Sequence, residues 1–170
     1  TLHTAFARTF ALSAPIKIYS ALMLADDLSE GKSFYMKEVD TIKEMISRSQ
    51  EGTANLFLFD EIFKGTNTTE RIAVAKAVLS YLNTTDNIIV ASTHDAELAT
   101  LLDTEYDLYH FSEVIQDETF SFDYKLKSGP LYQRNAIRLL EINGFPPTVI
   151  RDAYRTIEKI SYPPTSTQPL

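Results

Sequence analysis

A run of four bulky apolar residues followed at once by two carboxylates constrains this chain more than any other feature. The apolar run is residues 56–59, and Asp60 and Glu61 follow it. An apolar run without alternation is typical of a strand that is buried on both faces of a sheet. The carboxylates would then lie at the carboxyl edge of that sheet, where open α/β sheets bind ligands. The stretch therefore predicts a central strand with a polar site at its end.

Asp60 and Glu61 suit two different chemical roles. Neighbouring side chains on an extended backbone point to opposite sides. One carboxylate can hold a hydrated Mg²⁺, and the other can orient or deprotonate a water molecule that attacks a phosphate. A Gly-Thr loop at residues 65–69 comes soon after the acid pair. Together these features favour nucleotide hydrolysis over a strand that simply ends in charge.

A second stretch repeats this layout. Residues 88–93 form another continuous apolar strand, and His94 and Asp95 follow it. A lone histidine is usually structural or exposed. The position of His94 at the carboxyl end of a predicted strand favours a phosphate-sensing role.

The helix predicted between these two strands has its cap at Thr68 or Thr69. Its expected buried face carries four apolar residues, which are Ile72, Ala75, Leu79 and Leu82. Other helices are predicted at residues 2–13, for about 17 residues after Ser33, and at 96–102, 135–141 and 148–160. Further strands are predicted at residues 16–24, 106–114 and 120–127, and the tail at 161–170 is expected to be disordered.

The strand at residues 120–127 alternates aromatic and polar side chains, which is typical of a half-buried antiparallel strand. Residues 106–114 are its expected partner across a turn at 115–118. The aromatic stripe is interpreted as core and not as a stacking platform for nucleic acid.

Gly31, Lys32 and Ser33 do not form a phosphate-binding loop. That motif requires a glycine five residues before Gly31, and Asp26 occupies the position. Ser33 instead lies near the start of a predicted helix, where free backbone N–H groups can bind an anion. An ordinary helix cap is the alternative interpretation.

Composition limits the partners of the chain. Its 170 residues suit one domain, and its net charge of −7 argues against a main grip on DNA phosphates. The sequence has no cysteine, which excludes disulfides and thiolate metal sites and fits a cytoplasmic location. No apolar run approaches the length of a membrane span.

Taken together, these residues resemble the C-terminal ATPase domain of the MutS family of DNA mismatch repair proteins, within the ABC-type ATPase superfamily. The resemblance covers residues 21–160, and residues 122–129 are similar to divergent MutS-like members. Four motifs carry it in order, at residues 26–38, 58–69, 91–95 and 135–146. It implies an α/β fold of the P-loop NTPase type, with a largely parallel sheet flanked by helices, an antiparallel hairpin and a C-terminal helix pair.

The resemblance also implies a role for each candidate residue. Asp60 would hold Mg²⁺ through water, Glu61 would activate the hydrolytic water, and His94 would contact the γ-phosphate of ATP or that water. Gly31 and Ser33 match the signature loop, which faces the nucleotide bound by the other subunit of a homodimer. The loop that couples the two sites would comprise Gly65, Thr66, Asn67 and Thr68.

One departure from the family pattern is decisive, because these residues contain no Walker A loop. In the family that loop lies just upstream of a helix like residues 2–13. Residues 1–160 are therefore expected to be a partial ATPase domain that is inactive alone, with the DNA-binding domains further upstream. The alternatives are a catalytically silent dimerisation module and a metal-dependent phosphoesterase built on Asp60, Glu61 and His94.

Overall fold

The computed structural model describes residues 9, 11, 16–22, 34–84, 86–116, 119–131 and 135–161. The chain divides into two compact units, Thr1–Tyr106 and Asp107–Leu170. Three expectations lie outside the described residues: the helix at 2–13, the loop with Gly31 and Ser33, and the tail beyond residue 161.

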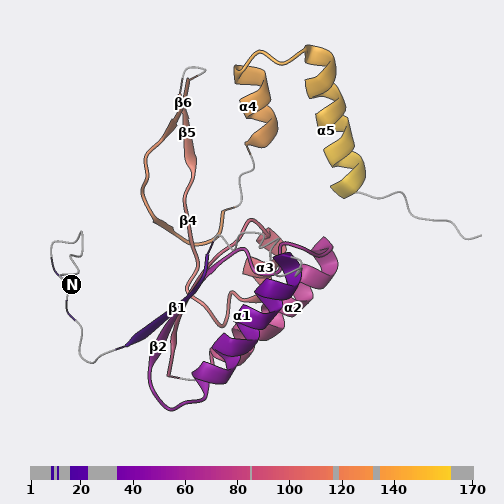
Figure 1. Cartoon of the computed structure of the whole chain (residues 1–170). Helices are drawn as coiled ribbons and strands as arrows, with labels where there is room; N and C mark the ends of the chain where they lie inside the picture. Colours follow the sequence, from indigo (N-terminus) through magenta and orange to yellow (C-terminus); the bar gives the residue numbers. More distant parts are fainter. Residues whose placement is uncertain are drawn as a thin grey trace, which may run out of the picture. The chain divides into compact units, whose positions relative to one another are not determined.

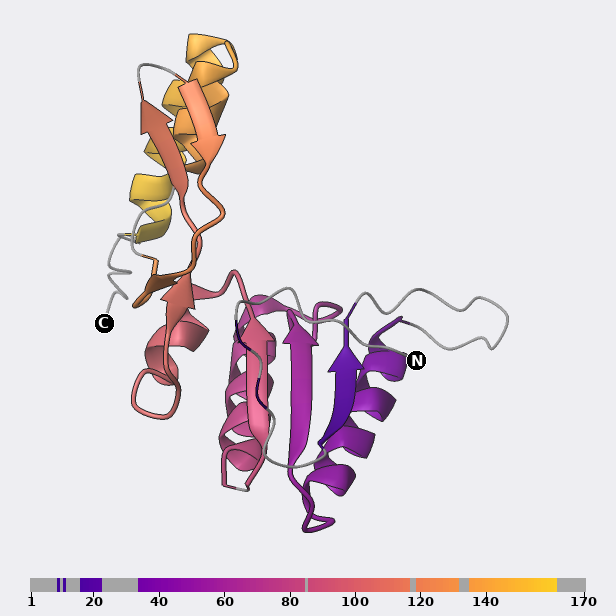
Figure 2. The same ribbon diagram turned by 90° about the vertical axis from the view of Figure 1, so that its left-hand side faces the viewer.

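The first unit is built on a parallel sheet of three strands, β1 (Lys17–Ala21), β2 (Asn55–Asp60) and β3 (Ile88–Ser92), in that spatial order. Helix α1 (Phe34–Ser49) connects β1 to β2, α2 (Thr68–Leu82) connects β2 to β3, and α3 (Ala96–Leu101) follows β3. Right-handed crossovers between successive neighbouring strands place their helices on the same face of a sheet. Figures 1 and 2 show this arrangement, with α1 and α2 both behind the three strands in Figure 2.

The core of the first unit lies between β2 and these helices. On β2, the side chains of Asn55, Phe57 and Phe59 are buried. Helix α2 buries Ala75, Leu79 and Leu82 and packs Ile72 against them, which confirms its predicted apolar face. Helix α1 contributes Ile42 and Met45. Each fully buried Leu, Phe or Met contributes about 1.5–3 kcal/mol.

The prediction of strands buried on both faces is wrong in the described part of the chain. Leu56 and Leu58 of β2 are only half-buried, and Ile88 and Val90 of β3 are 54% and 55% exposed. The reason is that α1 and α2 lie on one face of the sheet. An apolar run indicates a strand, but it does not show which elements cover its second face.

The second unit contains two short antiparallel pairs. Strand β4 (Tyr109–His110) pairs with β7 (Lys127–Ser128), and β5 (Glu113–Gln116) pairs with β6 (Thr119–Phe122). The antiparallel pairing is confirmed, but the two long strands predicted are wrong. Ile115 and Gln116 belong to β5 and not to the turn, and β6 ends before Tyr124, whose φ is +53°. Left-handed backbone at a non-glycine residue interrupts an extended strand.

The aromatic stripe of this strand is not core within the described residues. Phe120 is half-buried, whereas Phe122, Tyr124 and Leu126 are 52%, 84% and 60% exposed. Alternation identified a strand face correctly, but it could not identify a covering element.

Helices α4 (Ala136–Ile142) and α5 (Pro147–Ser161) close the second unit, near their predicted positions. Gly144, with φ +72°, ends α4 in a left-handed turn, and the N–H groups of Gly144 and Phe145 donate to the Glu141 and Leu140 carbonyls. Pro147 then begins α5, a position where its missing N–H costs nothing. Among the described helices, none is long and apolar enough to cross a membrane. The α/β class with a parallel sheet, antiparallel strands and C-terminal helices is confirmed, and the P-loop NTPase type stays a prediction.

Candidate functional site

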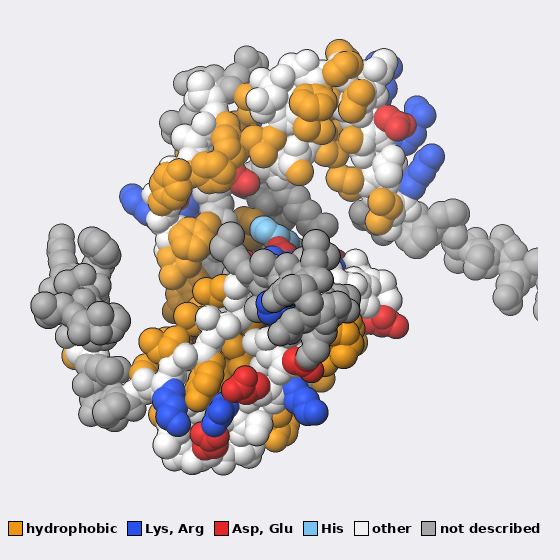
Figure 3. Space-filling model, in the orientation of Figure 1, with side chains coloured by type: hydrophobic (Ala, Val, Ile, Leu, Met, Phe, Trp, Pro, Cys, Tyr) orange, Lys and Arg blue, Asp and Glu red, His pale blue; other side chains and the backbone are white. Residues whose placement is uncertain are grey.

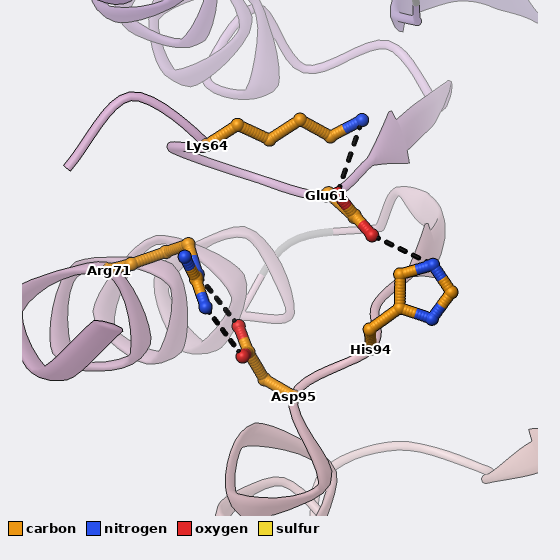
Figure 4. Close-up of a pocket in the computed structure, with 5 residues that line it drawn as sticks. All are labelled: Glu61, Lys64, Arg71, His94 and Asp95. Atoms are coloured by element: carbon orange, nitrogen blue, oxygen red, sulfur yellow. Dashed lines mark hydrogen bonds and ion pairs between the residues drawn. The ribbon is translucent and has the colours of Figure 1, made fainter. Parts of the chain in front are cut away.

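A charged pocket of about 200 Å³ lies at the carboxyl ends of β2 and β3. Five residues line it, and Figure 4 shows their side chains: Glu61, Lys64, Arg71, His94 and Asp95. Sites that enclose a whole small molecule usually measure about 300–1,000 Å³. This pocket therefore suits part of a ligand, such as one phosphate group and its waters.

Asp60 ends β2 beside Ser92, its partner in the parallel register. The Ser92 hydroxyl donates to Asp60 Oδ1 at 2.6 Å, and Lys64 Nζ lies 3.7 Å from Oδ2. The Ser92 hydrogen bond, helped by the charge of Lys64, lowers the pKa of Asp60 from its ordinary value. Asp60 is thus an ionised, partly exposed carboxylate at neutral pH.

Glu61 turns the chain away from the strand. Its φ is +53°, so the prediction that both acids lie on extended backbone is wrong at this residue. Its N–H donates to the Ser92 carbonyl at 3.0 Å. Its carboxylate contacts two cationic or ionisable groups, with Oε1 at 3.0 Å from His94 Nε2 and Oε2 at 3.3 Å from Lys64 Nζ. Figure 4 shows Glu61 between these two side chains.

His94 lies two residues beyond β3, and its side chain is 95% exposed. His94 therefore lies beside the acid pair, through its contact with Glu61. An exposed imidazole next to a carboxylate remains free to contact a ligand with its other nitrogen.

A second ion pair fixes the wall of the pocket. Arg71, from the first turns of α2, donates to both carboxylate oxygens of Asp95 at 2.9 and 2.7 Å. The two side chains are only 23% and 15% exposed. Hydrogen bonds from Arg71 lower the pKa of Asp95 below its ordinary value. Because Asp95 directly follows His94, the Arg71–Asp95 ion pair holds the segment that carries His94 against α2.

Lys64 lines the pocket, but the next residues of this loop, Gly65, Thr66, Asn67 and Thr68, do not. A Cβ on Gly65 would lie 3.0 Å from Tyr35 Cβ, so Gly65 allows a close approach to α1. Thr66 donates to the Glu70 carboxylate at 3.0 Å. The cap of α2 is Asn67, whose side chain accepts from the Glu70 N–H, and the prediction of Thr68 or Thr69 as cap is wrong. A role of Gly65, Thr66, Asn67 and Thr68 toward a nucleotide stays a prediction, as does that of Gly31 and Ser33.

The donor set at the strand ends fits Mg²⁺ better than a metal cluster. No group of three or more His, Cys, Asp or Glu residues within the described ranges could hold a metal ion. Mg²⁺ commonly uses one or two carboxylates, keeps several waters and completes its shell with substrate phosphates. Asp60 and the neighbouring Ser92 hydroxyl match that minimal protein contribution.

The sequence did not indicate three residues of this site as participants, Lys64, Arg71 and Ser92, and it indicated Asp95 only as a polar residue after the strand. Ser92 carried a usable signal, because the parallel order of two consecutive strands places their last residues side by side. Lys64 and Arg71 carried none, since a charged residue near a helix start is usually solvated.

Comparisons with known proteins agree with these motifs. The chain matches the family model for MutS domain V over residues 5–161. It is 30% identical over 149 residues to the DNA mismatch repair protein MutS of Lactobacillus delbrueckii subsp. bulgaricus. It is 29% identical over 149 residues to the protein of that name from Listeria monocytogenes serotype 4a. Each alignment covers 85% of this chain and only 17% of the relative's length.

Proposed function

The chain belongs to the MutS family, through its match to domain V, and on that premise we propose that it is part of the ATPase and dimerisation region of a MutS-like DNA mismatch repair protein, to which it contributes residues for Mg·ATP hydrolysis. One observation carries the proposal. Asp60, Glu61 and His94 come from two strand ends and meet at one edge of the sheet, with His94 Nε2 at 3.0 Å from Glu61 Oε1. An acid pair with an adjacent imidazole suits the positioning of a water against a phosphate.

The three residues would divide the work. Asp60, ionised and held by Ser92, would bind Mg²⁺ through a water molecule. Mg²⁺ would supply positive charge to the phosphate oxygens during transfer. Glu61 would orient the attacking water and accept its proton. His94, with its ring exposed, would contact the γ-phosphate of ATP or that water.

Lys64 would set the charge of the site before ligands bind. Its ammonium group lies 3.7 Å from an Asp60 oxygen and 3.3 Å from a Glu61 oxygen. Two adjacent carboxylates repel one another, and a nearby cation reduces that repulsion. Lys64 would therefore reduce the repulsion between the Asp60 and Glu61 carboxylates before ligands bind.

The remaining activities belong to a larger assembly. Because the chain spans only 17% of its MutS relatives, DNA binding is assigned to domains outside these residues. We place Gly31 and Ser33 opposite the nucleotide of a second subunit in a homodimer, and Gly65, Thr66, Asn67 and Thr68 in the coupling between the two sites. This proposal carries with it ATP and Mg²⁺ as ligands and a cytoplasmic location.

A second candidate function is a catalytically silent dimerisation module. Exposed apolar residues on α5 favour it, with Val149, Ile157 and Ile160 at 46%, 49% and 73% exposure. A metal-dependent phosphoesterase has less support, because two-metal chemistry needs more ligands than the described residues bring together.

The test uses the product of the complete gene. Phosphate release from ATP with Mg²⁺ is measured with and without mismatched duplex DNA, and p-nitrophenyl phosphate serves as a simple phosphoester. The ATPase proposal predicts ATP turnover that responds to DNA and is lost in Asp60→Ala. Turnover of the phosphoester alone would favour the phosphoesterase, and dimerisation without any turnover would favour the silent module.

A further inference from the structure

Glu38 is a buried acid that the proposed reaction does not use. It lies in the second turn of α1 and is only 4% exposed. Acidic side chains are rarely so buried unless they are paired. The Phe63 N–H donates a short hydrogen bond to Glu38 Oε1, whereas Oε2 has no hydrogen-bond partner among the described residues.

The backbone that Glu38 contacts has an unusual conformation. Glu61 and Phe63 have φ values of +53° and +61°, and the side chains of Ile62 and Phe63 are 6% and 5% exposed. Left-handed backbone is unfavourable for a non-glycine residue, because its Cβ approaches the following carbonyl oxygen. Such residues keep this conformation only where the surrounding structure holds them.

Two contacts from α1 hold this turn. The Glu38 carboxylate accepts the buried Phe63 N–H, which would otherwise lack a partner. One turn earlier, Tyr35 packs against Gly65 and places its ring 6.2 Å from that of Phe63. Helix α1 therefore contacts the turn on both sides of Lys64, at Phe63 and at Gly65.

We propose that Glu38 is a positioning residue for Glu61: by accepting the Phe63 N–H, it fixes the left-handed turn that aims the Glu61 carboxylate at His94. The effect of Glu38 on a reaction rests on the function proposed above, whereas its role in fixing the turn does not depend on that function. Burial raises the pKa of Glu38, while the N–H groups of Phe63 and Lys64 and the charge of Lys64 lower it. These donors favour the ionised, hydrogen-bond-accepting form against the cost of burial.

An apolar residue would fill this position at lower cost if packing were the only requirement. Burying a carboxylate is unfavourable unless it satisfies a donor that needs it. Glu38 also lies four residues before Ile42 and seven before Met45, on the face of α1 that enters the core. A carboxylate in that apolar face is explained by the backbone N–H it meets.

The experiment uses the complete gene product and four variants. Glu38→Gln keeps a hydrogen-bond acceptor, Glu38→Ala removes it, and Glu38→Met removes it while filling the space. Glu44→Ala is the matched control, because Glu44 lies on the same helix with its side chain 61% exposed. Hydrogen exchange of the peptide covering residues 61–66 reports the turn, the peptide covering 55–60 reports the core, and steady-state kinetics report the reaction.

We expect Glu38→Ala and Glu38→Met to raise the exchange rate at residues 61–66 by about tenfold or more, without a change at 55–60. Their kcat should fall by about 10–100-fold with KM nearly unchanged, because a misplaced Glu61 affects the chemical step more than binding. Glu38→Gln should recover most of both effects, and Glu44→Ala should match the parent. If Glu38→Ala fails to fold, Glu38→Met supplies the same comparison.

Unchanged exchange at residues 61–66 in both acceptor-free variants would overturn the proposal, as would faster exchange with an unchanged kcat. The proposal would also be contradicted if Glu38→Gln restored neither the kcat nor the slow exchange of residues 61–66. A parent protein that hydrolyses no ATP would instead refute the proposed function. The exchange measurements would then still decide whether Glu38 holds the turn.

Discussion

Helices α2 and α5 have the same length of 15 residues and both carry a regular apolar pattern, yet they end in different surroundings. Helix α2 buries Ala75, Leu79 and Leu82 against the sheet of its own unit. On α5, by contrast, Ile157 and Ile160 are 49% and 73% exposed. Figure 3 shows hydrophobic side chains gathered on the surface of the second unit. Apolar residues three or four positions apart therefore predict a helix, but they do not show which element covers their face.

The two units also differ in the interactions that stabilise them. The first unit has a closed core, and its sheet places the candidate site at the carboxyl ends of β2 and β3. In the second unit, local features define the described helices, such as the Gly144 turn and the start of α5 at Pro147. Substitutions in the first unit should therefore act mainly through core packing, and those in the second unit mainly through local backbone conformation.

The largest contrast is expected from matched truncations on the two helices. Leu79→Ala should lower the free energy of unfolding by about 2–5 kcal/mol, because it leaves a cavity in the core. Ile157→Ala should change it by no more than about 0.5 kcal/mol, since an exposed side chain loses few contacts. Urea unfolding of the 170-residue chain, followed by circular dichroism, measures both. A large loss in Ile157→Ala would mean that the apolar face of α5 is covered in solution.

A smaller contrast is expected between the two Arg–carboxylate pairs. Arg71→Gln should cost about 1–2 kcal/mol, because the Arg71–Asp95 pair is bidentate and mostly buried. Arg138→Gln should cost less than about 0.5 kcal/mol, because Arg138 is 47% exposed and pairs within one helix. The same unfolding titration tests both variants. Equal losses of unfolding free energy in the two variants would show that burial of the Arg71–Asp95 pair adds nothing to stability.

The Arg71 effect should also depend on pH with a defined sign. The pKa of Asp95 is lowered in the folded state from its ordinary 3.8, so the pair stabilises the fold above that value. The stabilisation is lost as pH falls through the lowered folded-state pKa. The parent and Arg71→Gln should therefore differ most at neutral pH and converge at acid pH. A difference that stays constant down to pH 2 would rule out the Asp95 charge as its source.

The smallest predicted contrast, between two substitutions of Gly144, tests the local features of the second unit. Gly144→Ala should destabilise the α4–α5 turn by about 1 kcal/mol, because alanine disfavours the left-handed φ of +72°. Gly144→Asn should cost less, since asparagine tolerates this conformation better. Exchange protection of the Gly144 and Phe145 amides, which donate across the turn, would report the change. Equal protection in all three proteins would contradict a locally determined turn.

Some features were predictable because they depend on neighbours in sequence. The spacing of Ala75, Leu79 and Leu82 identified the buried face of α2, and Gly144 with Pro147 located the break between α4 and α5. The polar residues after two predicted strands indicated a site at the carboxyl edge of the sheet, and Glu61 and His94 lie there 3.0 Å apart.

Other features depend on contacts between distant segments. The exposure of Val90 follows from which face α1 and α2 cover, and the bridge from Lys64 to both acids follows from the left-handed turn at Glu61. Glu38 belongs with these features, because its role depends on the distant Phe63 N–H that its carboxylate accepts.

Hydrolysis of ATP by Glu61→Gln in the complete gene product tests the proposed role of Glu61. Glutamine keeps the shape and hydrogen bonding of Glu61 but cannot accept the proton of the attacking water. We predict that single-turnover hydrolysis falls by at least about 100-fold while the affinity for Mg·ATP stays close to that of the parent. Hydrolysis at the parental rate would remove Glu61 from the mechanism and contradict the account.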